Sequence, residues 1–270
     1  MLAAGIDIGS TTTKVVLLDG DDVRTSLVIA TGSLPGETAR EAFSQALAQS
    51  DTRKADVDVI ATTGYGRRLA DFGDVVMTEI KACAVGARRC ESPEGAIHTV
   101  IDVGGQDTKV VALGDEGEVQ DFSMNDKCAA GTGRFLEMLA AKLGLDYEDF
   151  VAEALKSETM LQMNATCAVF AESEVVGMLA RKVSTPDIAA AAHNAIASRL
   201  SSMVRRIGRR GAYCFVGGGA RNAALVKALG ETLNHPLFVP EQAQTIVALG
   251  AAVGAQRKLA RAEEKEGELQ

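Results

Sequence analysis

The chain has 270 residues, 47% of them hydrophobic, so it can bury a sizeable core in one large or two modest lobes. Its net charge of −8 and its scattered basic residues argue against nucleic acid as a partner. The N-terminus lacks the features of a signal peptide, and the longest apolar run, at 246–255, is too short to span a bilayer. We therefore expect a soluble, cytoplasmic protein that does not bind membranes.

Strands and helices alternate along the predicted chain. A strand, a glycine-containing turn and a second strand are predicted at 6–18, followed by a β-like run at Ser26–Ala30, a helix at Glu37–Gln49 and a strand at Val57–Ala61. Further on, we predict a hairpin at 101–113, a β-like run at Val119–Phe122, a helix at Gly133–Leu143 and a strand that enters CFVGGGARN at 214–222. A last helix is predicted from near Glu241, and RAEEKEGELQ is expected to be a solvated, fraying tail. This alternation predicts an α/β fold.

An internal duplication is the most informative pattern. Residues 6–18 read IDIGSTTTKVVLL and residues 101–113 read IDVGGQDTKVVAL, so both copies share Ile-Asp, a β-branched residue, Gly, then Thr-Lys-Val-Val and a final Leu. Copies this far apart indicate two related lobes rather than a solenoid. We assign the first lobe to 1–95 and the second to 96–270, with a C-terminal helix that packs back on the first lobe.

Each copy of the duplication carries one aspartate, Asp7 or Asp102, at the end of an apolar strand. A carboxylate there is costly unless a cation meets it. The turns can hold anionic oxygens through backbone amides and small hydroxyls, and their residues are Gly9, Ser10, Thr11 and Thr12 in the first copy and Gly104 and Gly105 in the second. We interpret the hairpins as two phosphate clamps, with both aspartates placed for Mg²⁺ through water. The alternative, that each aspartate merely caps a turn, fits one copy better than two matched copies.

Residues near the second turn bear on the reaction. Gln106 can orient a water molecule but is not a strong base, which favours hydrolysis of ATP over transfer to a bulky acceptor. Asp107 could act as a base, which leaves a small-molecule kinase open. Lys14 and Lys109 recur just past the two turns, either as phosphate or carboxylate partners or as strand-edge lysines that face water.

A glycine run late in the chain is expected to contact the nucleotide. Gly217, Gly218 and Gly219 follow a predicted strand and would let a base and ribose approach the backbone. Asn222 either starts the next helix or contacts the nucleotide. The three histidines share no motif, and we assign them no chemistry.

The five cysteines, Cys83, Cys90, Cys128, Cys167 and Cys214, are widely spaced and form no CxxC pair. A disulfide framework is therefore not expected, and a zinc site held by one chain has weak support. On the residues alone, Cys128 is either a ligand or an ordinary packed cysteine at the start of a helix. A helix starting at Gly131 would point its N-terminal amides back toward Cys128 and stabilise a thiolate.

Together, these motifs resemble those of a known superfamily. The paired hairpins, the glycine run and the small-residue helix with ALGAA are similar to actin, Hsp70 chaperones and sugar kinases, which implies an actin/Hsp70/sugar-kinase-like ATPase fold with two related lobes. More narrowly, GIDIGSTTTK, TTGYGR, IDVGGQDTK, NDKCAAGTGRF, TCAVFAESEV and GGGARN resemble the ATP-dependent activators of 2-hydroxyacyl-CoA dehydratases and the related ATPase subunits of benzoyl-CoA reductase.

This resemblance implies a cofactor set and partners. A homodimer would hold one [4Fe-4S] cluster between its subunits, with Cys128 and Cys167 as the ligands from each chain, since a cubane cluster requires four thiolates. ATP hydrolysis with Mg²⁺ would drive a low-potential electron to an iron–sulfur acyl-CoA dehydratase or reductase, and a ferredoxin or flavodoxin would recharge the cluster. Cys83, Cys90 and Cys214 lie outside the matching motifs and are expected to be structural. We further expect nucleotide state to reorient the helix that follows Cys128.

Overall fold

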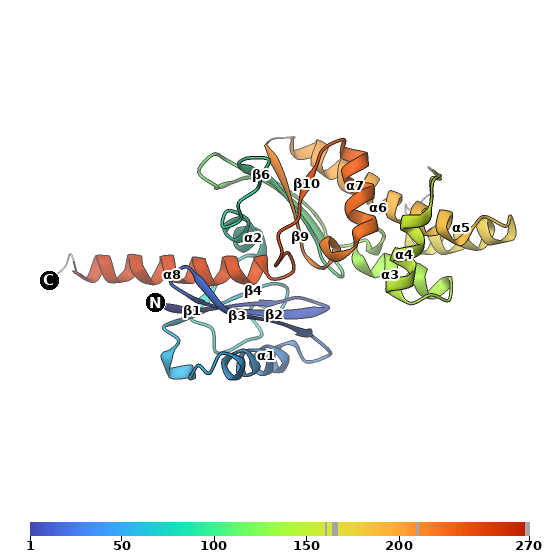
Figure 1. The fold of residues 1–270 in the computed structure, drawn as a ribbon. Helices are drawn as coiled ribbons and strands as arrows, with labels where there is room; N and C mark the ends of the chain where they lie inside the picture. The colour runs from blue at the N-terminus through green and yellow to red at the C-terminus, as the bar shows by residue number, and fades with distance from the viewer. Residues whose placement is uncertain (160, 164–166, 209–210, 268–270) are drawn as a thin grey trace. The chain divides into compact units, whose positions relative to one another are not determined.

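The computed structural model describes residues 1–159, 161–163, 167–208 and 211–267. It divides into two units, which are described separately (Figure 1). Unit 1 comprises Met1–Glu91, Glu116–Val119 and the chain from Gln244 on, and unit 2 comprises Ser92–Asp115 and Gln120–Ala243. The sequence predicted a boundary between the two lobes at residues 95 and 96. The C-terminal helix, which was predicted to pack on the first lobe, is part of unit 1.

Unit 1 is built on a five-stranded sheet of order β3-β2-β1-β4-β5. Strands β1, β2 and β3 are antiparallel, whereas β4 and β5 run parallel to β1. The strands are β1 (Leu2–Ile8), β2 (Thr12–Asp19), β3 (Asp22–Ala30), β4 (Val59–Thr63) and β5 (Val75–Val76). The helices are α1 (Pro35–Gln49), a 3-10 turn (Lys54–Asp56), α2 (Glu79–Ala87) and α8 (Ile246–Gly267).

The two faces of this sheet are covered by α1 and α8 (Figure 1). Helix α1 buries a stripe at helical spacing, Ala39, Ala42, Phe43 and Ala46, which packs in one core with Ile6 and Ile8 of β1. On the other face, Gly5 lies against the backbone of α8, where a Cβ would collide with the carbonyl oxygen of Ala248. The alternating residues of β1 therefore face α1 and α8 in turn.

Unit 2 contains a second five-stranded sheet, of order β10-β9-β6-β7-β8. Strands β6 and β7 are antiparallel, and β9 runs parallel to β6 and β10. The strands are β6 (Ile97–Val103), β7 (Thr108–Leu113), β8 (Val119–Asn125), β9 (Ala212–Val216) and β10 (Leu237–Phe238). The helices are α3 (Gly133–Lys142), α4 (Tyr147–Lys156), α5 (Ala168–Ala180), α6 (Thr185–Ile207) and α7 (Ala223–Leu233), with 3-10 turns at Ala129–Gly131 and Gly218–Arg221.

The core of unit 2 joins the sheet to its helices. Phe135 of α3, Phe150 of α4, Leu200 of α6 and Phe215 of β9 are all fully buried in one apolar cluster. Helix α6 has a clear start, because Ser184 accepts a hydrogen bond from the amide of Asp187 and a proline occupies the first turn. The cluster holds α3 and α6 beside the β6–β7 hairpin, where the second predicted phosphate turn lies.

The two sheets have the same strand order. Read from the third strand of each copy, they are β3-β2-β1-β4-β5 and β8-β7-β6-β9-β10. Both predicted hairpins are present, and their registers match, since Asp7 pairs with Lys14 and Asp102 pairs with Lys109. The duplication seen in two short segments therefore extends through a whole sheet.

Two expectations about the last helix were wrong, and four helices were not predicted. The last helix begins at Ile246 rather than near Glu241, because the residues after Pro240 form turns in which the Ala243 amide bonds to the Pro240 carbonyl. Residues 261–267 continue this helix instead of fraying, while 268–270 lie outside the described residues. The predicted elements omitted α2, α4, α5 and α6. In the described part of the chain, none of the helices combines the length and apolar character needed to cross a membrane.

Candidate functional site

The first predicted phosphate turn joins β1 to β2. The Lys14 ammonium lies 3.0 Å from Asp7 Oδ2, and both side chains are largely buried. The turn closes through the Gly9 amide and the Thr12 carbonyl, 3.1 Å apart. Thr31 braces it from the end of β3 by donating from its hydroxyl to the Gly9 carbonyl oxygen at 2.9 Å. Lys14 is thus a carboxylate partner rather than a strand-edge lysine facing water.

The second turn joins β6 to β7 and repeats this geometry with more charge. Lys109 lies 3.4 Å from Asp102 Oδ2 and 2.9 Å from Asp107 Oδ2, and its side chain is only 5% exposed. The turn closes through the Gly104 amide and the Asp107 carbonyl at 2.9 Å. Gln106 is exposed at the tip, where it can reach a water molecule outside the turn, and Thr11 occupies the equivalent exposed position in the first copy.

A tight glycine turn packs on each aspartate, from the parallel strand beside it. Gly64 follows β4 with φ +89°, and Gly217 follows β9 with φ +85°. A Cβ on Gly64 would meet Asp7 Oδ1, and one on Gly217 would meet Asp102 Oδ1. Both positions therefore need glycine for its backbone conformation and for the close approach. TGYG and VGGG are thus equivalent turns, which the sequence comparison of the two hairpins did not reveal.

The rest of the glycine run leads into α7. Gly218 is exposed and Gly219 is buried at the start of the 3-10 turn. Asn222 caps α7, because its Oδ1 accepts a hydrogen bond from the Leu225 amide at 2.9 Å. Its side chain is almost fully buried. Two roles were predicted for Asn222, and the structure shows it as the residue that starts α7. Contact with the nucleotide stays a prediction.

A buried polar network surrounds Asn222. Its Nδ2 donates to Tyr147 Oη at 2.9 Å and lies 3.0 Å from His193 Nε2. The other ring nitrogen of His193 lies 2.7 Å from the Ala189 carbonyl oxygen. Burial lowers the pKa of His193 to about 4, against the opposing effect of these hydrogen bonds, and burial also raises the pKa of Tyr147. His193 is therefore a neutral ring that ties α6 to the starts of α4 and α7, a role no sequence motif indicated.

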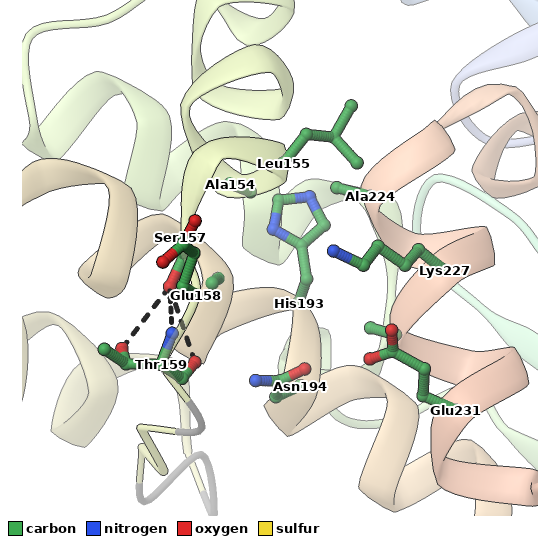
Figure 2. A pocket seen from close by; sticks show the side chains of 12 residues that line it. Ala154, Leu155, Ser157, Glu158, Thr159, His193, Asn194, Ala224, Lys227 and Glu231 are labelled. Carbon is green, nitrogen blue, oxygen red and sulfur yellow. Dashed lines mark hydrogen bonds between the residues drawn. The ribbon is translucent and has the colours of Figure 1, made fainter.

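His193 also lines a pocket of about 180 Å³ between α4, α6 and α7 (Figure 2). Figure 2 shows its ring lying between Leu155 of α4 and Lys227 of α7, with Asn194 and Glu231 nearby. The residues predicted to bind nucleotide or metal do not line this pocket. It is a neighbour of the Asn222 network rather than a part of the hairpin turns.

The segment around Cys128 is hydrogen-bonded directly to the β6–β7 turn, the second predicted phosphate turn. The amides of Gly133 and Arg134, the first two residues of α3, donate to the carbonyl oxygens of Gly104 and Gly105 at 3.0 Å each. Thr108 Oγ1 donates to the Gly131 carbonyl oxygen at 2.6 Å. Expecting these amides to point toward Cys128 was therefore wrong, because α3 starts at Gly133 and its first amides bond to the turn.

Both predicted ligand cysteines lie immediately before helical segments. Cys128 is half-buried at the edge of the core, and its carbonyl oxygen accepts a hydrogen bond from Asn125 Nδ2 at 2.9 Å. Cys167 is half-buried and is the N-cap residue of α5. The residues just before it, 164–166, include the Thr166 of the quoted motif and lie outside the described residues.

Helix α5 presents an exposed apolar face beyond Cys167. Val169 and Phe170 are each 66% exposed, and Val176 and Leu179 are 49% and 43% exposed. Its other face packs into the core through Ala171, Val175 and Met178. Glu172 forms an ion pair with Lys142 at 2.9 Å on the surface. An apolar surface of this kind is typical of a protein–protein contact.

The other cysteines have structural surroundings. Cys83 in α2 and Cys214 in β9 are fully buried, and Cys90 Sγ lies 3.8 Å from the Gly86 carbonyl oxygen. Among the described residues, no three His, Cys, Asp or Glu side chains gather in a metal-binding group.

Comparison with known proteins identifies relatives over nearly the whole chain. Residues 4–255 match the BadF/BadG/BcrA/BcrD ATPase family. The 2-hydroxyisocaproyl-CoA dehydratase activator of Clostridioides difficile is 38% identical over 94% of both chains. The (R)-2-hydroxyglutaryl-CoA dehydratase activating ATPase of Acidaminococcus fermentans is 38% identical over 95% of this chain and 98% of its own. A benzoyl-CoA reductase subunit of Thauera aromatica is 30% identical over 87% of this chain and 84% of its own.

Solved structures give the same result for the fold. The C. difficile activator with bound ADPNP superposes with a TM-score of 0.89 at 36% identity, covering 98% of both chains. A glucokinase of the ROK family from Streptomyces griseus superposes with a TM-score of 0.59 at 14% identity, covering 95% of this chain and all of its own, which shows a shared fold alone. The predicted actin/Hsp70/sugar-kinase-like ATPase fold is confirmed, and the chain belongs to the BadF/BadG/BcrA/BcrD ATPase family.

Proposed function

We propose that this protein is an ATP-hydrolysing activator of a 2-hydroxyacyl-CoA dehydratase, to which it delivers a low-potential electron. Relatives at 38% identity are named as such activators, and they match at nearly full length. The observation that carries the coupling is the pair of hydrogen bonds from α3 to the second phosphate turn. A change at that turn acts on the start of α3 directly, and Cys128 lies five residues before Gly133.

The hairpin turns supply the groups for hydrolysis. Ser10 and Gly105 would hold phosphate oxygens through their amides, while the Gly9 and Gly104 amides keep the two turns closed. Asp7 and Asp102 would bind Mg²⁺ indirectly, through hydrogen bonds to its water ligands. When bound, the cation would neutralise the charge that develops on the phosphates. The donor chemistry fits, because Mg²⁺ prefers carboxylate and water oxygens and both aspartates lie at the ends of strands, next to the turns. Exposed Gln106 would orient the attacking water.

The same turn bears on the kinase alternative. A kinase would need Asp107 as a base toward an acceptor hydroxyl. Its carboxylate instead folds back over the turn, 2.9 Å from Lys109, and a Cβ on Gly104 would collide with it. A carboxylate held in this ion pair is not free to approach an acceptor hydroxyl, so hydrolysis is favoured over transfer to a second substrate.

Cys128 and Cys167 would hold one [4Fe-4S] cluster together with the same residues of a second subunit. The residues fit this group, because both thiols are partly exposed at helix starts and α5 continues from Cys167 with an exposed apolar face. A two-fold contact along that face would bring two pairs of thiolates together, which matches the four that a cubane requires. When bound, the cluster would supply the one-electron chemistry, with a ferredoxin or flavodoxin as the donor.

The decisive experiment is anaerobic purification of the full chain with assay of iron, sulfide and mass. We expect a brown dimer with about four iron atoms per dimer, ATPase activity, and activation of a 2-hydroxyacyl-CoA dehydratase in the presence of a reductant. Cys128→Ala and Cys167→Ala should each remove the iron while nucleotide affinity stays within about twofold. Cys90→Ala is the matched control, because Cys90 is also partly exposed but lies outside the cluster motifs.

Other outcomes would assign the protein elsewhere. An iron-free protein whose ATP turnover rises with a sugar or small acid would make it a kinase. Iron and ATPase activity with activation of an aryl-CoA reductase alone would make it part of such a reductase, as its 30% identity to the T. aromatica protein allows.

A further inference from the structure

Thr63, at the end of β4, has a buried hydroxyl without a hydrogen-bond partner. The residue is fully buried, and its Oγ1 finds no donor or acceptor among the described residues. The neighbouring Thr62 is equally buried, but its hydroxyl donates to the Arg67 carbonyl oxygen at 2.8 Å. Native structures rarely leave a buried hydroxyl unpaired, because desolvation then goes uncompensated. The hydroxyl of Thr63 therefore calls for a partner that the described residues do not supply.

The strand register puts this hydroxyl beside Asp7. Thr63 and Asp7 are direct partners on the parallel strands β4 and β1, so their side chains leave the same face of the sheet. That face is the one that α8 covers, because Gly5, two residues before Asp7, meets the α8 backbone at Ala248. Thr63 and Asp7 are thus the last residues of their strands on the α8 face.

Helix α8 runs antiparallel to β1, so its N-terminus points toward the end of β1 that carries this pair. Gln256 of α8 donates to the Met1 carbonyl oxygen at 2.9 Å, while Ala248 lies at Gly5. The two residues from Gly5 to Asp7 span roughly 7 Å, which corresponds to about four residues of helix. Helix α8 starts at Ile246, two residues before Ala248, so its first amides point toward Asp7 from roughly 4 Å further along the strand and add positive potential there.

The second copy lacks the hydroxyl. Asp102 pairs with Val216 on β9, at the position that Thr63 occupies beside Asp7. Val216 is nearly the same size and shape as threonine but cannot form hydrogen bonds. The two hairpins are therefore matched in their Asp–Lys pairs and differ in this one polar group.

We propose that Thr63 is a positioning residue that hydrogen-bonds a water ligand of the divalent cation addressed by Asp7. The proposal rests on the function proposed above. A hydroxyl can accept from or donate to such a water and still leave Asp7 Oδ2 to Lys14. The asymmetry between Thr63 and Val216 then makes the first turn the side on which the hydrated cation is held.

Thr63→Val tests this proposal, because it puts into the first copy the residue type that Val216 has at the equivalent position of the second copy. We would titrate a fluorescent ADP analogue into the anaerobically purified full chain, with Mg²⁺ and with EDTA. Thr63→Val should weaken binding about tenfold with Mg²⁺, the factor expected for one lost charge-assisted hydrogen bond. Binding in EDTA should stay within about twofold, Thr63→Ser should restore the Mg²⁺ effect, and the Tm of the nucleotide-free protein should not fall.

Thr62→Val is the matched control, since it removes a partnered hydroxyl from the next residue. It should lower the Tm and leave the Mg²⁺ effect unchanged. Equal Mg²⁺ dependence in wild type and Thr63→Val, or a lower Tm for Thr63→Val without nucleotide, would overturn the inference and make the hydroxyl a structural group. Failure of the wild type itself to bind ADP would refute the proposed function instead.

Discussion

The backbone amide of Gly133 donates a hydrogen bond to the carbonyl oxygen of Gly104, with the two atoms 3.0 Å apart. In the first copy of the hairpin, the equivalent carbonyl, that of Gly9, accepts from the Thr31 side chain at 2.9 Å. One turn is thus braced by a residue next to its own sheet, and the other by the helix that follows Cys128. This difference makes the second turn the one connected to the predicted cluster ligand.

Replacing Gly133 with proline should weaken the response of Cys128 to nucleotide. Proline suits the first position of a helix, and Thr132 before it has the extended backbone that proline requires. The amide donor is lost, and the proline Cδ takes the place of its hydrogen, so the Gly104 oxygen can no longer lie 3.0 Å from this nitrogen. The measurement is the rate of Cys128 alkylation in cluster-free protein, with ADP and with ADPNP. We expect the ratio of these two rates to move roughly fivefold closer to one in the variant, which corresponds to about 1 kcal/mol. Gly133→Ala keeps the donor but places a Cβ 3.3 Å from the Gly104 oxygen, so it should retain most of the ratio. Loss of the ratio in both variants would contradict this role for the hydrogen bond.

Replacing Lys109 with methionine should lower the free energy of unfolding more than replacing Lys14 with methionine. Lys109 is 5% exposed and neutralises two carboxylates, so Lys109→Met leaves Asp102 buried and unpaired and should cost about 3 kcal/mol or more. Lys14 is 14% exposed and faces one carboxylate, so Lys14→Met should cost less. Urea unfolding at pH 7 measures both. Adding Asp102→Asn to Lys109→Met should recover part of the loss, and a loss that stays unchanged would rule out charge as its cause.

A charge on the exposed face of α5 should prevent the dimer without unfolding the chain. Phe170 and Val176 are largely exposed, so Phe170→Asp and Val176→Asp disturb little of the core but place a carboxylate in any apolar contact. We expect monomers by light scattering and loss of iron, with an unchanged circular dichroism spectrum. Leu69→Asp, at 56% exposure in unit 1, is the control and should stay dimeric. Dimeric, iron-loaded Phe170→Asp would exclude this face as the contact.

The buried His193 should make stability fall at mildly acidic pH. Its pKa is about 4 in the folded chain and 6.5 in the unfolded chain, so between these values only the unfolded chain takes up the proton. The contribution of His193 to stability should therefore decrease as pH falls from 6.5 to 4 and stay level below that, with a total loss of roughly 3 kcal/mol.

His193→Gln removes this titration while keeping a side-chain acceptor for Asn222. The free energy of unfolding, compared at pH 7.5 and pH 5.0, should drop by about 2 kcal/mol more in wild type than in the variant. An equal drop in both proteins would mean that His193 is protonated in the folded state.

Much of the fold was predictable because its information is local and repeated. The matched segments at 6–18 and 101–113 define both hairpins, and their alternating apolar residues define which side chains are buried. Helices α1 and α3 follow from their periodic apolar stripes. Helix α5 was missed because it is apolar on nearly all sides, so its pattern has no periodicity.

The site was predictable only as far as residue types. The sequence placed Asp7, Asp102 and their lysines near the turns but left the lysines as either carboxylate partners or surface residues. The ion pairs depend on cross-strand register, which brings Lys14 opposite Asp7 and Lys109 opposite Asp102. The glycine turns after β4 and β9 were quoted as motifs, yet their contact with the aspartates arises from parallel pairing between distant segments.

By itself, the sequence determined the α/β class, the duplication, the ATPase family motifs and the two cysteines worth testing, because each is written in short stretches of residues. Only the tertiary structure decided that α3 bonds to Gly104 and Gly105, that His193 joins Asn222, and that Thr63 lies buried without a partner beside Asp7. Those relationships join residues that are 29 to 56 positions apart, as for Gly133 with Gly104 and Thr63 with Asp7. Hydrogen bonds and burial at such separations depend on how strands and helices pack, which no local pattern encodes.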